Sequence, residues 1–168
     1  KMIQKPIFKP QTEWLPPTEF PDLSDHAEIA IDLETKDTDL MKMGSGAITK
    51  NGEVVGIAVA VEGWSGYFPI AHEGGGNMDS TMVVKWFQDI LNTNSTKIFH
   101  NAMYDVCWIR SMGFKINGKI VDTMIAAGLC DENQMRYDLN TCARKYTGTG
   151  KDEAALYAAA KEWGVDAK

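Results

Sequence analysis

Two acidic residues interrupt the end of an apolar run in the segment IAIDLET, residues 29–35. Asp32 and Glu34 are two positions apart, so on a strand their side chains lie on the same face and close together. Two ionised carboxylates without a counter-charge repel each other, and burial strengthens the repulsion. A hard divalent cation such as Mg²⁺ removes this conflict, because it binds carboxylate oxygens. An isolated Asp-x-Glu pair is also common at strand ends that simply meet solvent, so the pair alone leaves both interpretations open.

A second polar set stands in HNAMYDV, residues 100–106, directly after the short apolar segment KIFH. Asn101 and Asp105 are four apart, and a helix starting here places them on one face. If IAIDLET and KIFH form neighbouring parallel strands, Asp105 faces Asp32 and Glu34 at the carboxyl edge of the sheet, where sites of α/β proteins form. The alternatives are that Asn101 is only a helix N-cap and that Asp105 is a solvated acid in a first turn.

The flanking sequence predicts the elements that would hold these residues. Alternating apolar residues make 29–35 a strand, and two further strands follow at 54–63 and 66–72 across short turns, which implies an antiparallel meander. The polar segment 35–46 between them is expected to be a loop. Helical spacing of apolar residues then predicts a helix over 78–92 behind an Asp79 or Ser80 cap. Further elements are a strand at 97–100, a helix ending at Gly113, and a strand at 120–121 followed directly by a helix. Two more helices are predicted, at 137–145 and at 151–163.

This order of elements predicts an α/β fold, with a mixed sheet covered by helices. Five of the six prolines lie in the first 21 residues, so residues 1–26 are expected to be an extended arm and residues 27–168 the folded domain. The net charge of −6 argues against a domain that holds nucleic acid by bulk electrostatics alone. No apolar run approaches the ~18 residues of a membrane span, so we expect no membrane partner.

Three segments in a fixed order carry a resemblance to a known family. IDLET (31–35), HNAMYDV (100–106) and IVDTMIAAGL (120–129) resemble the first two motifs and the following Asp-Thr-Met segment of DEDD 3′-to-5′ exonucleases. The chain is most similar to the proofreading exonuclease domain of family A DNA polymerases, the polymerase I type, and among them to phage enzymes. The resemblance implies a ribonuclease-H-like fold, in which a three-stranded antiparallel meander continues into parallel strands and helices flank the sheet.

The resemblance also implies the chemistry of the acidic residues. The family hydrolyses the 3′-terminal phosphodiester bond with two metal ions, Mg²⁺ or Mn²⁺. By position, Asp32 would bridge both ions, Glu34 would hold one ion and help orient the attacking water, and Asp105 would serve the other ion. These three residues are therefore the predicted catalytic and metal-binding residues.

The residues around the acids receive roles by the same comparison. Thr35 would lie near the terminal nucleotide, and Asn101 and Tyr104 beside the nucleotide strand. His100 and Asp122 are possible accessory residues. For His100 a strand-end position next to the site is favoured over a catalytic base. For Asp122, which ends a strand, a capping role for the following helix is favoured over a place in the site.

The family pattern lacks one part in this sequence. The fourth acid of the superfamily comes from a late helix, as Tyr-x-x-x-Asp or His-x-x-x-x-Asp. Four residues after Tyr157 stands Lys161, and Glu162 lies off that helical face by about 100°. The expectation is that the sequence stops before the third motif, and that the fragment binds metal weakly and turns over slowly or not at all.

The leading hypothesis is thus a proofreading domain that acts on the single-stranded 3′ end of DNA, with a polymerase domain on its C-terminal side in the parent chain. The fragment is expected to be monomeric and cytoplasmic, in the host cytoplasm if a phage encodes it. Two alternatives remain: an RNA-trimming exonuclease of the ribonuclease D type, and a catalytically dead ribonuclease-H-like binding or scaffold module. The downstream sequence would separate them.

Overall fold

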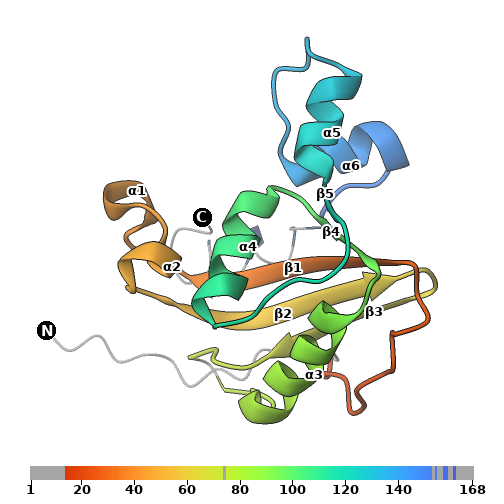
Figure 1. Cartoon of the computed structure of the whole chain (residues 1–168). Helices are drawn as coiled ribbons and strands as arrows, with labels where there is room; N and C mark the ends of the chain where they lie inside the picture. The colour runs from red at the N-terminus through yellow and green to blue at the C-terminus, as the bar shows by residue number, and fades with distance from the viewer. Residues whose placement is uncertain (1–13, 74, 153, 155–156, 159–160, 162–168) are drawn as a thin grey trace, which may run out of the picture.

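The computed structural model describes residues 14–73, 75–152, 154, 157–158 and 161. One five-stranded sheet dominates this part of the chain, with helices packed on it (Figure 1). The strands are β1 (Glu28–Lys36), β2 (Glu53–Val61), β3 (Trp64–Pro69), β4 (Thr96–Phe99) and β5 (Ile120–Asp122). The helices are α1 (Leu40–Met43), α2 (Gly46–Thr49), α3 (Ser80–Asn92), α4 (Ala102–Ser111), α5 (Thr123–Cys130) and α6 (Leu139–Thr147).

The sheet has the predicted mixed topology, in the order β3-β2-β1-β4-β5. The first three strands form the antiparallel meander, and β1, β4 and β5 run parallel. The prediction that IAIDLET and KIFH are parallel neighbours is confirmed, since Ala30 lies opposite Ile98. Because β1 continues six residues beyond Ala30 while β4 ends at Phe99, the carboxyl end of β1 projects past its parallel partner.

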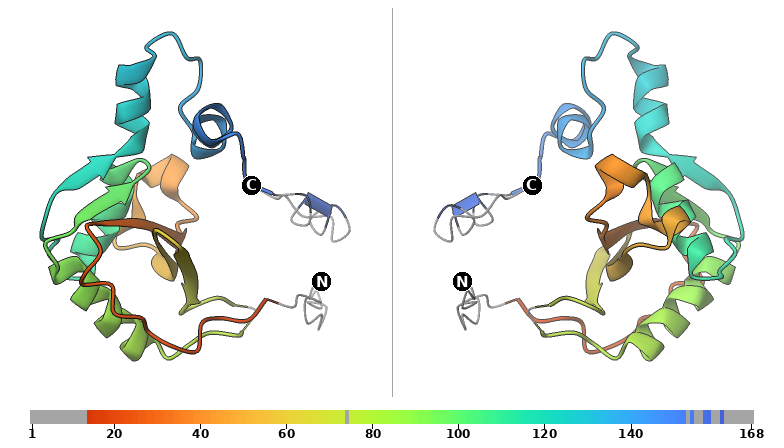
Figure 2. Two further views of the ribbon diagram at one scale, coloured as in Figure 1. Left: turned by 90° about the vertical axis from the view of Figure 1, so that its right-hand side faces the viewer. Right: turned by 90° about the vertical axis from the view of Figure 1, so that its left-hand side faces the viewer.

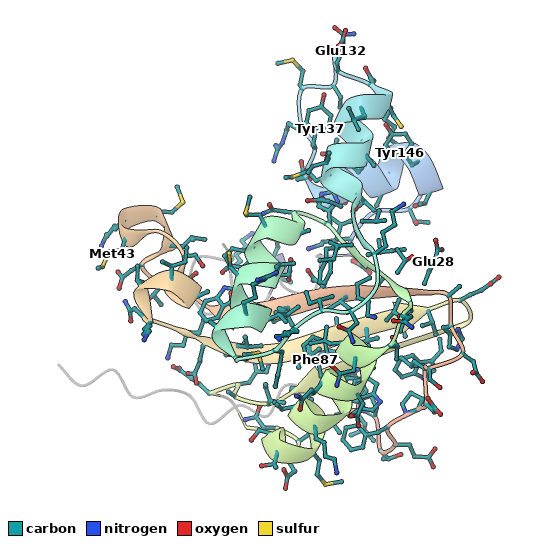
Figure 3. All side chains as sticks on the ribbon, viewed as in Figure 1. Glu28, Met43, Phe87, Glu132, Tyr137 and Tyr146 are labelled. Carbon is teal, nitrogen blue, oxygen red and sulfur yellow. The ribbon has the colours of Figure 1, made fainter. Side chains whose placement is uncertain are left out.

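The alternation of β1 divides the sheet into a buried and an open face. Ile29, Ile31 and Leu33 are at most 6% exposed and pack in the core, whereas Asp32 and Glu34 face the other way. α3 and α4 cover the core face (Figure 2). The labelled Phe87 on α3, fully buried, lies in this layer (Figure 3). The acidic pair is therefore held on the open face by apolar residues that alternate with it.

One sequence prediction needs correction. Residues 35–46 do not form a plain loop: the chain folds into the short helices α1 and α2, around the carboxylate of Asp37, which accepts hydrogen bonds from the Gly46 N–H at 3.0 and 3.1 Å. Of the two residues predicted as the cap of α3, Asp79 is the one that accepts N–H groups of the first turn. Of the predicted helix at 151–163, most residues, including Glu162, lie outside the described part of the chain, as do residues 1–13 of the predicted arm. Residues 20–23 of that arm contact the core, where Leu23 is buried and the Trp86 ring N–H donates to the Pro21 carbonyl.

No helix within the described residues is long and apolar enough to cross a membrane.

The two ends of the sheet differ in charge, because the amino end of β4 contains a buried cation instead of acids. Lys97 is fully buried, and its ammonium group donates to the carbonyls of Thr93, Ser95 and Asn117 at 2.5, 3.1 and 3.0 Å. It thereby joins the C-terminus of α3 to the segment that precedes β5, and a cation is favourable at a helix C-terminus.

Replacing Lys97 with methionine should lower the free energy of unfolding by about 2–4 kcal/mol, because several buried carbonyls lose their donor while the aliphatic volume is kept. Urea unfolding of the purified chain measures this. Lys119→Met is the matched control, since Lys119 is exposed and lies on the neighbouring segment, and it should change little. A Lys97→Met variant as stable as the control would contradict the structural role given to the ammonium group.

Candidate active site

The projecting end of β1 is completed by a side chain instead of a strand. Beyond the last residue pair with β4, the N–H of Leu33 donates to Asp105 Oδ1 at 3.0 Å. Asp105 comes from the first turn of α4, the helix that follows β4. The crossover from β4 to α4 therefore brings this carboxylate back over the edge of β1, beside the strand position of Asp32.

Asp105 is buried, with 3% of its surface exposed, so the alternative of a solvated first-turn acid is wrong. Burial raises the pKa of Asp105 to about 7, and the nearby charges of Asp32 and Asp122 act in the same direction, against the hydrogen bond from Leu33. A carboxyl group in this environment is half protonated near neutral pH. An opposite charge beside it would favour the ionised form.

Asp32 and Glu34 lie on the open face as the alternation predicts, and both are exposed to solvent. Asp32 lines a cavity on this face. Desolvation raises the pKa of Asp32, although the charges of Lys151 and His100 oppose the shift. The negative charge of Asp32 contributes to the raised pKa of Asp105, and the Asp105 carboxylate contacts the N–H of Leu33, the residue next to Asp32. The negative charge of Glu34 acts instead on Tyr67 of β3, where it adds to the effect of burial in raising the pKa of the phenol. Within the described ranges, no three His, Cys, Asp or Glu side chains are grouped closely enough to hold a metal ion.

Asp122 fixes the start of the helix that carries Asp105. Its carboxylate accepts hydrogen bonds from the N–H groups of Asn101, Ala102 and Met124 at 3.0, 2.8 and 2.9 Å. The same acid therefore caps α4 and α5, which meet at the ends of the parallel strands β4 and β5. Partial burial works to raise the pKa of Asp122, but these hydrogen bonds outweigh it and the pKa is lowered. The predicted capping role is present, and it extends to a second helix.

His100 links β4 to the α5 and α6 unit. Its Nε2 lies 2.8 Å from the Tyr137 carbonyl oxygen and must donate to it, while Nδ1 lies 2.9 Å from the Thr123 hydroxyl. Both ring nitrogens of His100 thus have hydrogen-bond partners within the protein, which favours a structural role over that of a catalytic base. Tyr137 and the labelled Tyr146 belong to the unit that stands above the sheet (Figure 3).

The predicted nucleic-acid residues divide into a bonded pair and a separate residue. The Tyr104 hydroxyl donates to Asp37 Oδ2 at 3.0 Å and lies 2.7 Å from the Thr35 hydroxyl, which therefore donates to it. Thr35 and Tyr104 are thus joined at the carboxyl end of β1. Asn101 is exposed, adopts a left-handed backbone conformation with φ of 70°, and makes no side-chain cap, so the N-cap alternative is wrong for its side chain.

A cavity of about 520 Å³ opens on the uncovered face of the sheet. Its floor is made of small residues of β1 and β2, among them Ala30, Ala58 and Ala60. Asp32, Tyr67 and His100 also line it. An apolar floor with a carboxylate beside it suits a ligand that combines a flat apolar part with a group that interacts through a cation or hydrogen bonds.

Sequence reasoning assigned no role to two residues near the acids. The positive charge of Lys151 acts to lower the pKa of Asp32. The local sequence does not indicate this, because Lys151 follows α6 and is distant from Asp32 along the chain. The register of the strands aligns Tyr67 with Ala58 and Asp32, and the Tyr67 side chain comes near Glu34 because it lies across Gly56, the residue opposite Glu34. A mixed sheet flanked by helices, with acids at the carboxyl end of its first strand, is the ribonuclease-H-like architecture of the exonuclease class.

Comparison with known proteins agrees with this class. Residues 19–163 match the model of a family described as 3′-5′ exonuclease. The chain therefore belongs to the 3′-5′ exonuclease family. It is 34% identical to a DNA-directed DNA polymerase of Pseudomonas phage M6 over 99% of this chain, and it spans only 26% of that polymerase.

Solved structures resemble the chain in fold. Brucella melitensis NrnC with bound Mg²⁺ superposes with a TM-score of 0.55 and 19% identity, covering 78% of this chain and 58% of that one. Escherichia coli RNase D, described as an exoribonuclease involved in structured RNA processing, gives a TM-score of 0.55 with 17% identity, over 77% of this chain and 30% of that one. At these identities the likeness establishes the fold alone.

Proposed function

We propose that the chain removes nucleotides from the 3′ end of single-stranded DNA, as the proofreading part of a longer DNA polymerase whose polymerase domain follows it. The observation that carries this is that the buried Asp105 carboxylate accepts the N–H of Leu33, the residue next to Asp32, at the projecting end of β1. Two carboxylates in such an arrangement favour a bound cation. The phage relative, a DNA polymerase covered to a quarter of its length by this chain, supports the choice of DNA and of a polymerase partner.

The residues present suit a divalent cation in their chemistry, because carboxylate oxygens are the ligands that Mg²⁺ and Mn²⁺ prefer. Asp32, Glu34 and Asp105 would hold it. When bound, such an ion supplies a Lewis acid for the scissile phosphate and a water of lowered pKa. Asp105, held by the Leu33 N–H, keeps one carboxylate oxygen fixed against the strand.

The neighbouring residues would bind and orient the substrate. The hydroxyl pair of Thr35 and Tyr104 would lie beside the terminal nucleotide and the strand leading to it, and Asn101 would contact that strand from the start of α4. His100 and Asp122 would act through the backbone by fixing β4, α4 and α5. We place the folded unit in residues 27–168; from the preceding arm, Trp14 also lines the cavity and contacts the Tyr67 ring.

A 5′-labelled single-stranded DNA oligonucleotide, mixed with excess protein and Mn²⁺, tests this function. We expect a ladder of products shortened one nucleotide at a time, prevented by EDTA, and at least a ~100-fold slower rate for Asp32→Asn, because an ion ligand is lost. Asp89→Asn, an exposed acid of α3 on the other face, is the matched control. A ladder that survives Asp32→Asn would refute the site.

The same assay run with an oligoribonucleotide separates the RNA-trimming alternative, whose fold-level support is the likeness to RNase D. Faster shortening of RNA than of DNA would favour that alternative. Tight binding of either strand that neither Mn²⁺ nor Asp32→Asn alters, without any shortening, would favour a binding module.

A further inference from the structure

The side chain of Tyr67 in β3 lies across the neighbouring strand β2 at Gly56, where any other residue would clash with it. A Cβ atom at position 56 would lie 1.9 Å from the Tyr67 hydroxyl oxygen and 2.4 Å from Cζ of its ring. The outer end of the phenol therefore rests directly on the backbone of Gly56 in β2. This fixes the position of the hydroxyl on the open face of the sheet.

Gly56 is also the residue opposite Glu34 in the pairing of β2 with β1. Residues directly opposite each other on antiparallel strands project from the same face, with their Cβ positions about 5 Å apart. The Tyr67 hydroxyl thus occupies the space that a side chain at position 56 would fill, next to the Glu34 side chain. Consistent with this, burial and the negative charge of Glu34 together raise the pKa of Tyr67 to about 12. A tyrosine phenol, whose ordinary pKa is about 10, carries its proton at neutral pH in any case.

His72 holds the hydroxyl from the other side, since its Nε2 is hydrogen-bonded to the Tyr67 oxygen. The segment that carries His72 is anchored at an irregularity of β2. Between Glu34 and Thr35 the register shifts, and Val55 is the extra residue of the bulge. The Val55 carbonyl accepts the N–H groups of residues 70 and 71, at 2.9 and 3.1 Å, immediately before the histidine.

Asn77 fixes the backbone of His72 itself. The His72 N–H donates to Asn77 Oδ1 at 2.7 Å, and Asn77 Nδ2 donates to the His72 carbonyl at 2.8 Å. These two hydrogen bonds fix the loop that carries the His72 imidazole. If Nε2 carries the proton and donates to the phenol oxygen, the phenol proton points away from His72 and is available to a carboxylate.

We infer that Tyr67 is a positioning residue for Glu34: its hydroxyl, supported by His72, donates a hydrogen bond to the Glu34 carboxylate directly or through one water. This rests on the proposed function, in which Glu34 is a metal ligand. The role differs from that of the acids, because Tyr67 acts on the orientation of a ligand. Hydrogen bonds to ligating carboxylates orient them and affect metal affinity about 10–100-fold.

Crystal structures of the metal-free full chain and of Tyr67→Phe test the geometry. Phenylalanine keeps the ring over Gly56 and removes only the hydroxyl. We expect the Glu34 carboxylate of the unmodified chain to lie within hydrogen-bond distance of the Tyr67 oxygen or of one shared water, and to adopt another rotamer in Tyr67→Phe. A Glu34 carboxylate that is directed away from Tyr67, or that is unmoved by the substitution, overturns the inference.

Calorimetric titration with Mn²⁺ tests the coupling. Tyr67→Phe should weaken binding about 10-fold, and it should cause no further loss in a Glu34→Gln background, because the residue acts through Glu34. Tyr146→Phe, an exposed tyrosine of α6, is the control and should match the unmodified chain. Equal losses in both backgrounds, or none in either, refute the inference. If the unmodified chain takes up no Mn²⁺, the metal part of the proposed function fails, and the crystal structures still decide the position of Glu34.

Discussion

Asp105→Asn should make the metal-free domain more stable at pH 8, by about 1–3 kcal/mol in the free energy of unfolding. Asparagine keeps an oxygen that can accept the Leu33 N–H and removes a buried charge. The same substitution should weaken Mn²⁺ binding strongly, since a charged ligand is lost. Stability and metal binding thus change in opposite directions at one residue.

The pH dependence of this effect has a definite sign. The pKa of Asp105 is raised from 3.8 to about 7 in the folded chain. Below about pH 4 both folded and unfolded chains carry the proton, so the charge costs nothing. Between pH 4 and 7 the unfolded chain releases it first, and stability is lost as pH rises through this window. The difference between Asp105→Asn and the unmodified chain should therefore be small at pH 4 and reach a plateau above pH 7.

Urea unfolding in EDTA at four pH values between 4 and 8.5 measures this difference. Asp89→Asn provides the baseline, because Asp89 is exposed on α3 and its substitution should show no such pH profile. A variant at position 105 that is less stable than the unmodified chain at pH 8, or a difference that is constant with pH, would show that Asp105 is not held in a desolvated, acid-rich environment.

Asp122→Ala is the second substitution with a large expected effect, a loss of about 2–4 kcal/mol in the free energy of unfolding. It removes the acceptor for N–H groups at the starts of both α4 and α5. The loss should be largest above pH 4 and should shrink at lower pH, because the pKa of this carboxyl is lowered and its contribution disappears as the folded chain takes up the proton.

Asp79→Ala is the matched comparison for Asp122→Ala, since Asp79 caps α3 alone, through the N–H groups of Thr81 and Met82. We expect it to cost about 1 kcal/mol, as single caps do. Thermal or urea unfolding of the two variants gives the comparison. Equal losses would mean that Asp122 stabilises one helix only, and that α4 does not depend on it for its position.

The sheet could be predicted from the sequence because its strands carry strong local signals. Alternation in 29–35 and the Asn51-Gly52 turn before β2 specify the meander, and the face on which Asp32 and Glu34 lie follows from period two alone. The short helices α1 and α2 could not be predicted, because four residues are too few to show helical periodicity. Their form depends on hydrogen bonds to Asp37, which a sequence pattern does not reveal.

The acidic residues of the candidate site could be identified from the sequence, but their environments could not. The burial of Asp105 follows from how far β1 runs past β4, and this depends on the lengths of two strands distant in the sequence. Similarly, the position of Tyr67 beside Glu34 requires the register of three strands and a glycine at the crossing point. Such properties arise from tertiary geometry, for which local spacing gives no signal.

The bulge at Val55 also limits where the chain can change length. Because Val55 is the extra residue, losing it would leave Val54 and Gly56 paired with Thr35 and Glu34 in regular register, and the later side chains of β2 would keep their faces. It would also remove the carbonyl that anchors the loop before His72. A deletion at Val55 is therefore compatible with the pairing of the sheet but not with the position of His72, whereas a change of length at the exposed turn around Gly63 disturbs neither.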